Sequence, residues 1–238
     1  MNLEQIKCQS CSISRLCLPV MLADAEIEHL DSIVKRRKPY QKDDVLFRYG
    51  DPLESLYAVR SGCLKTYTLD SDGTEQITGF YLPGEIIGLD AIADNTHQSF
   101  AKALDTSLVC ALPYNKLDIL AGQIPGLRSQ LLKIMSNEIQ DDKALFLLLN
   151  KKNSEQRLAA FIINLSRRYA NRGLASDRFQ LPMTQVDIAN YLGMAVETIS
   201  RLFKKLNKLE LLELKQKEIN IINMQQLSQF AGTSCHVN

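Results

Sequence analysis

The sequence predicts an α+β protein with an N-terminal antiparallel β-roll, a long dimerisation helix and a C-terminal winged helix-turn-helix. Between residues 38 and 117, short apolar runs are separated by glycine turns, which is typical of closely spaced antiparallel strands. After residue 125 the apolar residues follow a helical period that continues to about residue 150. Beyond residue 183, two short amphipathic helices flank a glycine and precede a β-ribbon.

The composition is that of a globular protein, because 45% of the 238 residues are hydrophobic and 23% are charged. No apolar run is long enough for a membrane span, and residues 1–7 lack the order of a signal peptide. We therefore expect a cytoplasmic protein without a membrane partner. Its six cysteines are then expected to be reduced thiols or metal ligands rather than disulfides.

Four segments are expected along the chain. They are a cysteine-rich segment (1–19), a β-roll sensor domain (20–122), a dimerisation helix (123–152) and a winged helix-turn-helix domain (153–238). From Lys151 onward the chain has 13 basic and 7 acidic residues, which leaves 15 and 20 for the remainder. This division of charge indicates that the C-terminal part meets a polyanion.

The N-terminal segment holds three cysteines within ten residues, Cys8, Cys11 and Cys17. Sets of four thiolates bind either zinc or an iron–sulfur cluster, and the spacing by itself does not decide between them. The candidates for a fourth ligand are Cys63, Cys110 and Cys235. Cys63 and Cys110 are expected in strands, where each would otherwise be a small buried hydrophobic side chain.

The strands of the roll are expected at short apolar or alternating runs bounded by glycines. These runs are Val45–Phe47, Leu56–Val59, Leu64–Leu69 and Ser107–Leu112. A short helical pattern over residues 25–34 precedes them. Strands at this spacing predict an antiparallel sandwich or roll.

The long helix carries a heptad seam, in which side chains recur at alternating spacings of three and four residues. The seam consists of Leu132, Met135, Ile139, Asp142, Phe146 and Leu149. A helix packed along one domain would show this period too, but a seam between two domains favours a parallel helix pair in a homodimer. Asp142 then either faces its symmetry mate, at a cost of about 2–3 kcal/mol before screening, or lies off the seam in water.

Residues 183–193 predict a short helix with Thr184 as its N-cap. Gly193 supplies the positive φ that a tight turn requires, and a second helix follows from Val196 to Leu206. Its buried side is expected to consist of Ile199, Leu202, Phe203 and Leu206. Ala195 occupies its N-cap position, where no side-chain cap is possible.

The opposite face of the second helix carries the side chains that a recognition helix presents to the major groove. Glu197 can accept from cytosine, Arg201 can donate to guanine, and Val196 can pack on a thymine methyl group. Ser200 can contact a base or a phosphate. A basic turn at residues 215–217 between two short strands predicts a wing. The alternative is a helical hairpin without a DNA role, but the order of helix, glycine, helix and ribbon favours DNA reading.

In this order, the roll, the long helix and the DNA-reading motif resemble the family of the catabolite activator protein and of FNR, the fumarate and nitrate reduction regulators. The resemblance covers nearly the whole chain and is carried by the runs Cys8–Cys17, Ser107–Cys110 and Val196–Arg201. It implies a transcription regulator, not an enzyme, that activates or represses anaerobic metabolism genes. It also implies a homodimer on a two-fold symmetric DNA site.

The resemblance further implies one oxygen-labile [4Fe-4S] cluster per monomer. The implied ligands are Cys8, Cys11, Cys17 and Cys110. The implied readers of TTGAT-type half-sites are Glu197, Ser200 and Arg201. With the cluster bound, the N-terminal segment would be held on the roll and the helix pair would form despite Asp142. Loss of the cluster to oxygen would favour monomers, which lose the avidity of two half-sites.

RNA polymerase is a further partner that the resemblance implies. Ser61, Arg172 and Gly73 match parts of the family's polymerase-contacting surface, whereas Thr74 replaces an acidic residue there. Cyclic nucleotides are not expected as ligands. Gln98 stands where the cyclic-nucleotide-binding relatives have an arginine, and residues 79–101 contain no Lys or Arg that could pair with a buried phosphate.

Two other functions remain open from the sequence. In one, the DNA-binding dimer is kept and the cysteines form a zinc or thiol-redox site. In the other, the protein is a redox enzyme that uses a cluster for electron transfer. The sequence disfavours an enzyme, because it has no nucleotide-binding glycine loop, flavin motif or catalytic triad. Its three histidines are dispersed at His29, His97 and His236.

Overall fold

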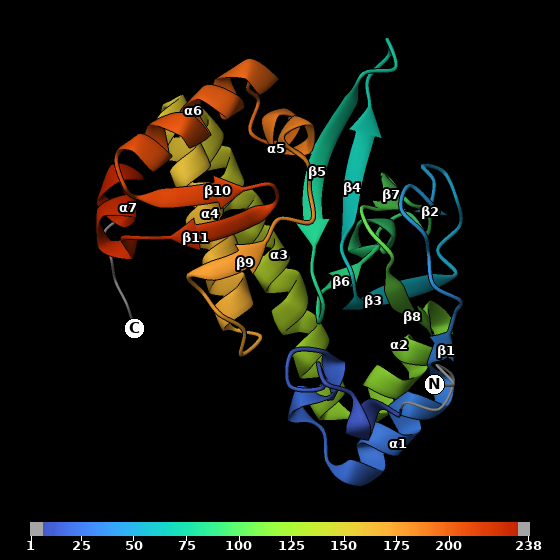
Figure 1. The fold of residues 1–238 in the computed structure, drawn as a ribbon. Coiled ribbons are helices and arrows are strands. Elements are labelled where there is room, and N and C mark those ends of the chain that lie inside the picture. The colour runs from blue at the N-terminus through green and yellow to red at the C-terminus, as the bar shows by residue number, and fades with distance from the viewer. Residues whose placement is uncertain (1–6, 233–238) are drawn as a thin grey trace. The chain divides into compact units, whose positions relative to one another are not determined.

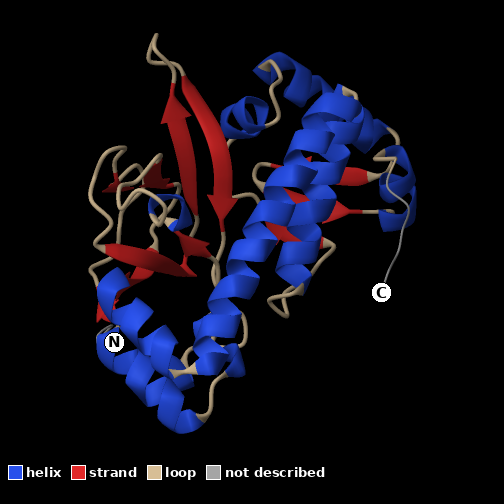
Figure 2. Cartoon of the chain, turned by 180° about the vertical axis from the view of Figure 1, so that it is seen from behind, coloured by secondary structure: helices blue, strands red, loops and turns tan. Residues whose placement is uncertain are grey.

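The computed structural model describes residues 7–232, so Cys235 and His236 lie outside the described residues. The chain divides into two compact units, residues 1–139 and 140–238 (Figure 1). Each unit combines helices with antiparallel strands, as Figure 2 shows in blue and red. The predicted α+β class is therefore confirmed. Within residues 7–232, no helix is long and apolar enough to cross a membrane.

The first unit contains a roll of two four-stranded sheets. Its strands are β1 (Lys35–Arg36), β2 (Val45–Phe47), β3 (Ser55–Ser61), β4 (Leu64–Leu69), β5 (Glu75–Tyr81), β6 (Ile86–Ile87), β7 (Phe100–Ala103) and β8 (Leu108–Pro113). The sheet orders are β1-β8-β3-β6 and β2-β7-β4-β5, with antiparallel neighbours throughout. Both sheets contribute to one apolar interior, in which Val59, Leu64 and Ile87 are completely buried.

Helices cover the other face of the β1-β8-β3-β6 sheet. They are α1 (Asp24–Ile33), α2 (Tyr114–Gln123) and the beginning of α3 (Pro125–Lys151). The expectation of strand character up to residue 117 is wrong beyond Pro113. That proline ends β8 and is the N-cap of α2, and Leu117, Leu120 and Ala121 then bury one face at helical spacing.

The second unit contains the expected helix-turn-helix and wing. Its elements after α3 are α4 (Ser154–Ala170), β9 (Arg178–Gln180), α5 (Gln185–Tyr191), α6 (Val196–Lys208), β10 (Leu212–Lys215), β11 (Glu218–Ile221) and α7 (Met224–Phe230). Thr184 caps α5 as predicted, accepting from the amide of Asp187 at 3.1 Å. The wing has a third strand that was not predicted, because β9 pairs with β11.

Candidate functional site

Three of the cysteines lie in an N-terminal segment built from tight turns. Cys8 begins a short 3-10 helix, and its carbonyl accepts from the amide of Cys11 at 3.3 Å. Cys17 directly precedes a second 3-10 helix, Leu18–Met21, and its amide donates to the carbonyl of Ile13 at 3.2 Å. These turns fold the segment back on itself, so that its three thiols reach one pocket.

Cys110 reaches the same pocket from strand β8. Because successive side chains of a strand point to opposite faces, Val109 and Ala111 enter the roll interior while Cys110 faces the helices outside it. Its register partners are Ala58 on β3 and Arg36 on β1. Strand pairing therefore places Cys110 in the middle of a sheet, beneath the N-terminal segment.

The remaining walls of this four-cysteine pocket are mainly apolar. They include Leu18, Leu30, Val34, Ala58 and Leu112. Cys63 does not line the pocket. The prediction that Cys63 lies in a strand is wrong, because it lies in the short loop between β3 and β4, where it is 1% exposed. All five cysteines among residues 7–232 are free thiols.

Ionisation of the thiols is unfavourable in this pocket. Burial raises the pKa of the Cys8 thiol, and it raises the pKa of Cys17 to about 12. Burial also raises the pKa of Cys110, although the positive charges of Arg36 and Arg60 act in the opposite direction. Negative charge on neighbouring cysteines adds to all three pKa shifts. A set of thiolates here therefore needs a bound cationic group.

The donor set and its apolar surroundings fit a thiolate-ligated metal group. Within residues 7–232, no group of three or more His, Cys, Asp and Glu side chains has the arrangement of a metal site. The four cysteines share one pocket, and their thiols are of the ligand type that such a group takes.

Asp31 and Arg36 hold the first cysteine against the roll. Asp31, on α1, accepts from the backbone amide of Cys8 at 2.8 Å and forms an ion pair with Arg36 on β1. Arg36 in turn lies beside Cys110 in the sheet. Through this ion pair, the segment that carries Cys8 is attached to β1, the strand that pairs with Cys110 of β8. Sequence reasoning missed both residues, because a contact between positions 23 residues apart leaves no local pattern.

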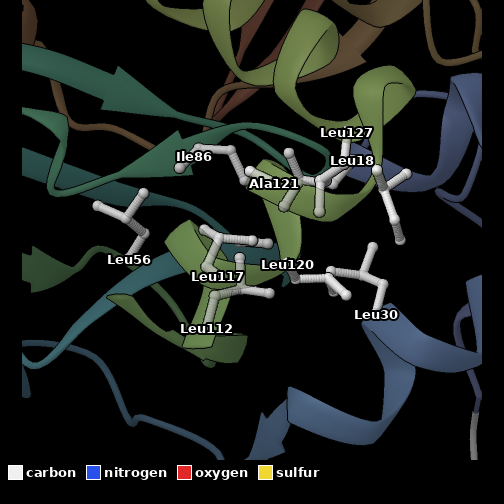
Figure 3. Packing of buried hydrophobic residues seen from close by; sticks show 11 residues of the cluster. Leu18, Leu30, Leu56, Ile86, Leu112, Leu117, Leu120, Ala121 and Leu127 are labelled. Carbon is white, nitrogen blue, oxygen red and sulfur yellow. The ribbon is translucent and has the colours of Figure 1, made fainter. Parts of the chain in front are cut away.

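A hydrophobic cluster connects the pocket to the first turns of α3 (Figure 3). Leu18, which follows Cys17, packs in this cluster with Leu127 of α3, and both are almost completely buried. Cys17 and Cys110 contact the cluster, as does Leu131 further along α3. The position of the cysteine segment is therefore coupled by direct packing to the start of the long helix.

The predicted seam of α3 lies largely on the surface of the single chain. Leu132, Ile139 and Phe146 are 61%, 53% and 65% exposed. Asp142 is also exposed, whereas Met135 and Leu149 are half-buried. A stripe of large apolar side chains with this exposure is typical of a surface that another protein covers.

The recognition helix α6 has the two faces that its sequence predicts. Ile199, Leu202, Phe203 and Leu206 are buried, as predicted. The expected DNA-reading residues lie elsewhere on the helix: Val196, Glu197 and Arg201 are exposed, and Ser200 is half-buried. Gly193 has the predicted positive φ, 62°. Ala195 is the N-cap and makes no side-chain hydrogen bond, also as predicted.

The ribbon β10–β11 forms a wing with an exposed basic turn. Lys215, Gln216 and Lys217 are exposed and line a shallow cleft together with Gln180 of β9. Gln216 has a φ of 56°, the left-handed backbone conformation that closes the two strands tightly. The turn therefore presents two lysines to solvent, the arrangement that suits phosphate contacts.

The residues expected to contact RNA polymerase lie in both units. Ser61 ends β3, and Gly73 lies in the turn between β4 and β5 with a φ of 81°. Arg172 lies in the turn after α4 and donates to the carbonyl of Arg168. All three are in or next to turns, where a partner can reach them.

A carboxylate lies beside the position at which cyclic-nucleotide-binding relatives would hold a phosphate. Asp90 accepts from the hydroxyl of Ser99 at 2.7 Å and from the amide of Gln98 at 3.1 Å. The side-chain amide of Gln98 donates to the carbonyl of Thr96 at 3.1 Å. The buried His97 lies 3.7 Å from Asp90. A negative charge here opposes the binding of an anion.

Asp90 also makes a pH-dependent contribution to stability. Burial acts to raise the pKa of Asp90, but the nearby His97 and the hydrogen bonds from the Ser99 hydroxyl and the Gln98 amide outweigh it and hold the pKa below its usual value. The stabilisation is therefore present above the ordinary aspartate pKa of about 3.9, and it is lost as the pH falls through the lower pKa of the folded state.

We expect Asp90→Asn to lower the free energy of unfolding at pH 7 by about 1 kcal/mol. The difference from the unsubstituted protein should shrink toward zero as the pH falls below the lowered pKa of the folded state, where Asp90 is protonated in both states. Urea denaturation at a series of pH values measures both quantities. A difference that stays constant with pH would contradict the role assigned to this carboxylate.

Comparison with known proteins gives two matches to family models and many full-length relatives. Residues 37–123 match the cyclic nucleotide-binding domain, and residues 156–230 match the Crp-like helix-turn-helix domain. The chain is 54% identical to the anaerobic regulatory protein of Pasteurella multocida, covering 96% of this chain and 84% of that one. It is 53% identical to the fumarate and nitrate reduction regulatory protein of Escherichia coli K12, covering 98% and 93%. The solved structure of FixK2 from Bradyrhizobium japonicum matches with a TM-score of 0.76 at 29% identity, covering 83% of this chain and 97% of that one.

Proposed function

The chain belongs to the fumarate and nitrate reduction branch of the CRP/FNR transcription regulators, and we propose that it is an oxygen-responsive member whose four-cysteine pocket holds a [4Fe-4S] cluster. This branch consists of DNA-binding regulators of the anaerobic response and not of enzymes. The proposal adds the cofactor, its ligands, the DNA half-site and the dimer contacts.

The observation that carries the proposal is the shared pocket of Cys8, Cys11, Cys17 and Cys110. When bound, a [4Fe-4S] cluster supplies an oxygen-labile cationic group that favours four thiolates in apolar surroundings. The chain contributes one thiol from a strand and three from a segment of turns. Ligation by all four would fasten the segment to the roll.

Fastening the segment has a consequence for α3, because the two share the hydrophobic cluster around Leu18 and Leu127. With the segment in place, the first turns of α3 keep their packing. The seam around Ile139 and Phe146 is exposed in the single chain, so a second copy can pair along it. Pairing of two chains gives two recognition helices and adds the avidity of a second half-site.

In this proposal the reading of a TTGAT-type half-site falls to α6. Glu197 accepts from cytosine, Arg201 donates to guanine, and Ser200 contacts a base or a phosphate. Lys204 and Lys208, later on the same helix, are exposed and suit phosphate contacts. The protein is proposed to act in the cytoplasm without a cyclic nucleotide, since Asp90 opposes an anion, and to contact RNA polymerase.

The proposed polymerase contacts are Ser61 and Gly73 in the first unit and Arg172 in the second. Gly73 is exposed and Ser61 and Arg172 are half-buried, and each lies in or beside a turn of its own unit. Thr74 follows Gly73 in the same turn, so this part of the surface lacks an acidic residue that the family carries.

The DNA-reading part of the proposal predicts the effect of Arg201→Ala. Loss of a bidentate guanine contact should cost about 1–3 kcal/mol, or about 5- to 150-fold in affinity for a duplex with two TTGAT half-sites. Affinity for a random duplex should fall far less. Fluorescence anisotropy on both duplexes, at one salt concentration, measures the ratio of the affinity for the two-half-site duplex to the affinity for the random duplex.

Lys208→Ala is the matched control, because it removes a cation near the end of the same helix. It should weaken binding to both duplexes by a similar factor. If Arg201→Ala also weakened both duplexes equally, Arg201 would be a phosphate contact and the assigned reading face would be wrong.

The sensing part is tested by exposing protein purified without air to oxygen. We expect the dimer fraction in analytical ultracentrifugation and the affinity for the two-half-site duplex to fall together. If the dimer fraction and the affinity for the duplex were the same before and after exposure to oxygen, the proposed sensing would be wrong.

A further inference from the structure

Arg157, in the first turns of α4, donates three hydrogen bonds to backbone carbonyls of other segments. Its Nη2 donates to Leu149 at 2.6 Å, its Nε to Lys152 at 2.9 Å and its Nη1 to Leu192 at 3.2 Å. Leu149 lies in the last turn of α3, Lys152 follows that helix, and Leu192 is the C-cap of α5. One side chain therefore joins three places in the chain.

The accepting carbonyls explain why an arginine occupies this position. Carbonyls at the C-terminal end of a helix lack intrahelical partners and carry partial negative charge. A guanidinium has five donors in a planar fork and remains charged, so it can satisfy three such carbonyls at once. A lysine at this position has a single nitrogen and cannot reach three separate carbonyls in this way.

These contacts restrict the geometry between the dimerisation helix and the DNA-reading motif. Only Lys152 and Asn153 connect α3 to α4. Leu192 immediately precedes the Gly193 turn, and the recognition helix α6 begins three residues after that turn, at Val196. Arg157 thus ties the turn of the helix-turn-helix directly to the end of α3.

We propose that Arg157 is a positioning residue that sets the spacing between half-sites that the dimer accepts. The inference rests on the proposed function, in which two chains pair along α3 and each α6 reads one half-site. The separation of the two α6 helices then depends on how firmly each motif is attached to its own α3. Without the three hydrogen bonds, each motif still reads its half-site, but the dimer no longer prefers one spacing between the two half-sites over another.

The test uses the full chain purified without air and a series of duplexes. Each duplex carries two inverted TTGAT half-sites, with the spacer at its optimum or changed by one or two base pairs, and a further duplex carries a single half-site. The unsubstituted protein should lose affinity on the order of tenfold when the spacer changes. For Arg157→Gln, we expect the loss to fall below about threefold, while affinity for the single half-site stays within about twofold.

Two further variants complete the experiment. Arg167→Gln removes an exposed arginine from the same helix and should keep the spacing preference. Arg157→Lys keeps the charge but not the fork and should resemble Arg157→Gln. An unchanged spacing preference in both Arg157 variants would overturn the inference. Loss of single-half-site affinity in both would also overturn it, because Arg157 would then act within one motif. Failure of the unsubstituted protein to prefer two half-sites over one would instead overturn the proposed function.

Discussion

Replacement of Cys110 by alanine is expected to abolish retention of the cofactor and to weaken anaerobic DNA binding by about 100-fold or more. Cys110 is the thiol that the roll contributes to the pocket, whereas the other three belong to the N-terminal segment. Without it, ligation no longer joins the segment to β8. Dimerisation is then lost, and with it the binding of a second recognition helix to the second half-site. Iron content per chain and binding to a two-half-site duplex measure the two effects.

Cys63→Ala is the matched control for this prediction. Cys63 belongs to the same roll and is buried, but it does not line the four-cysteine pocket. We expect this variant to keep its iron and its DNA affinity, with only the modest loss of stability that follows from removing a small buried side chain. If Cys110→Ala kept its iron and Cys63→Ala lost it, the ligand assignment would be wrong.

Asp142→Ala is expected to stabilise the dimer in the absence of the cofactor. Two carboxylates that face each other at about 6 Å repel by about 2–3 kcal/mol before screening. Removal of that repulsion should lower the dimer dissociation constant by about tenfold or more in dilute salt. Sedimentation of protein purified in air measures the change, and added salt should reduce it.

Asp141→Ala provides the comparison, since Asp141 is exposed on the same turn of α3 but lies outside the heptad seam. The dimer dissociation constant should fall strongly in Asp142→Ala and only weakly in Asp141→Ala. Equal effects of the two substitutions would mean that Asp142 is solvated off the seam and that net charge alone controls association.

The DNA-reading motif could be predicted closely from the sequence because its determinants are local. Helical spacing of Ile199, Leu202 and Phe203 defines the buried face, and Gly193 marks the turn. β9 was missed, since a strand of three residues, Arg178–Gln180, is too short to show alternation. It exists because it pairs with β11, a contact between segments about 40 residues apart.

The fourth cysteine could not be assigned from residue spacing, and only the family resemblance pointed to Cys110. Cys63 and Cys110 are both single cysteines within the strand-rich region. Their places in the sheet distinguish them: β8 lies between β1 and β3, and the alternation of its side chains directs Cys110 to the outer face, toward the N-terminal segment. Such pairing depends on contacts between distant parts of the chain. The role of Arg157 was hidden for the same reason, because its partner Leu192 is 35 residues away.

Metal analysis of protein purified without air tests most directly whether the four cysteines hold an oxygen-labile iron–sulfur cluster. We expect a brown protein with about four iron and four sulfide per chain, whose visible absorbance bleaches on exposure to air. Colourless protein that contains zinc in place of iron would contradict it.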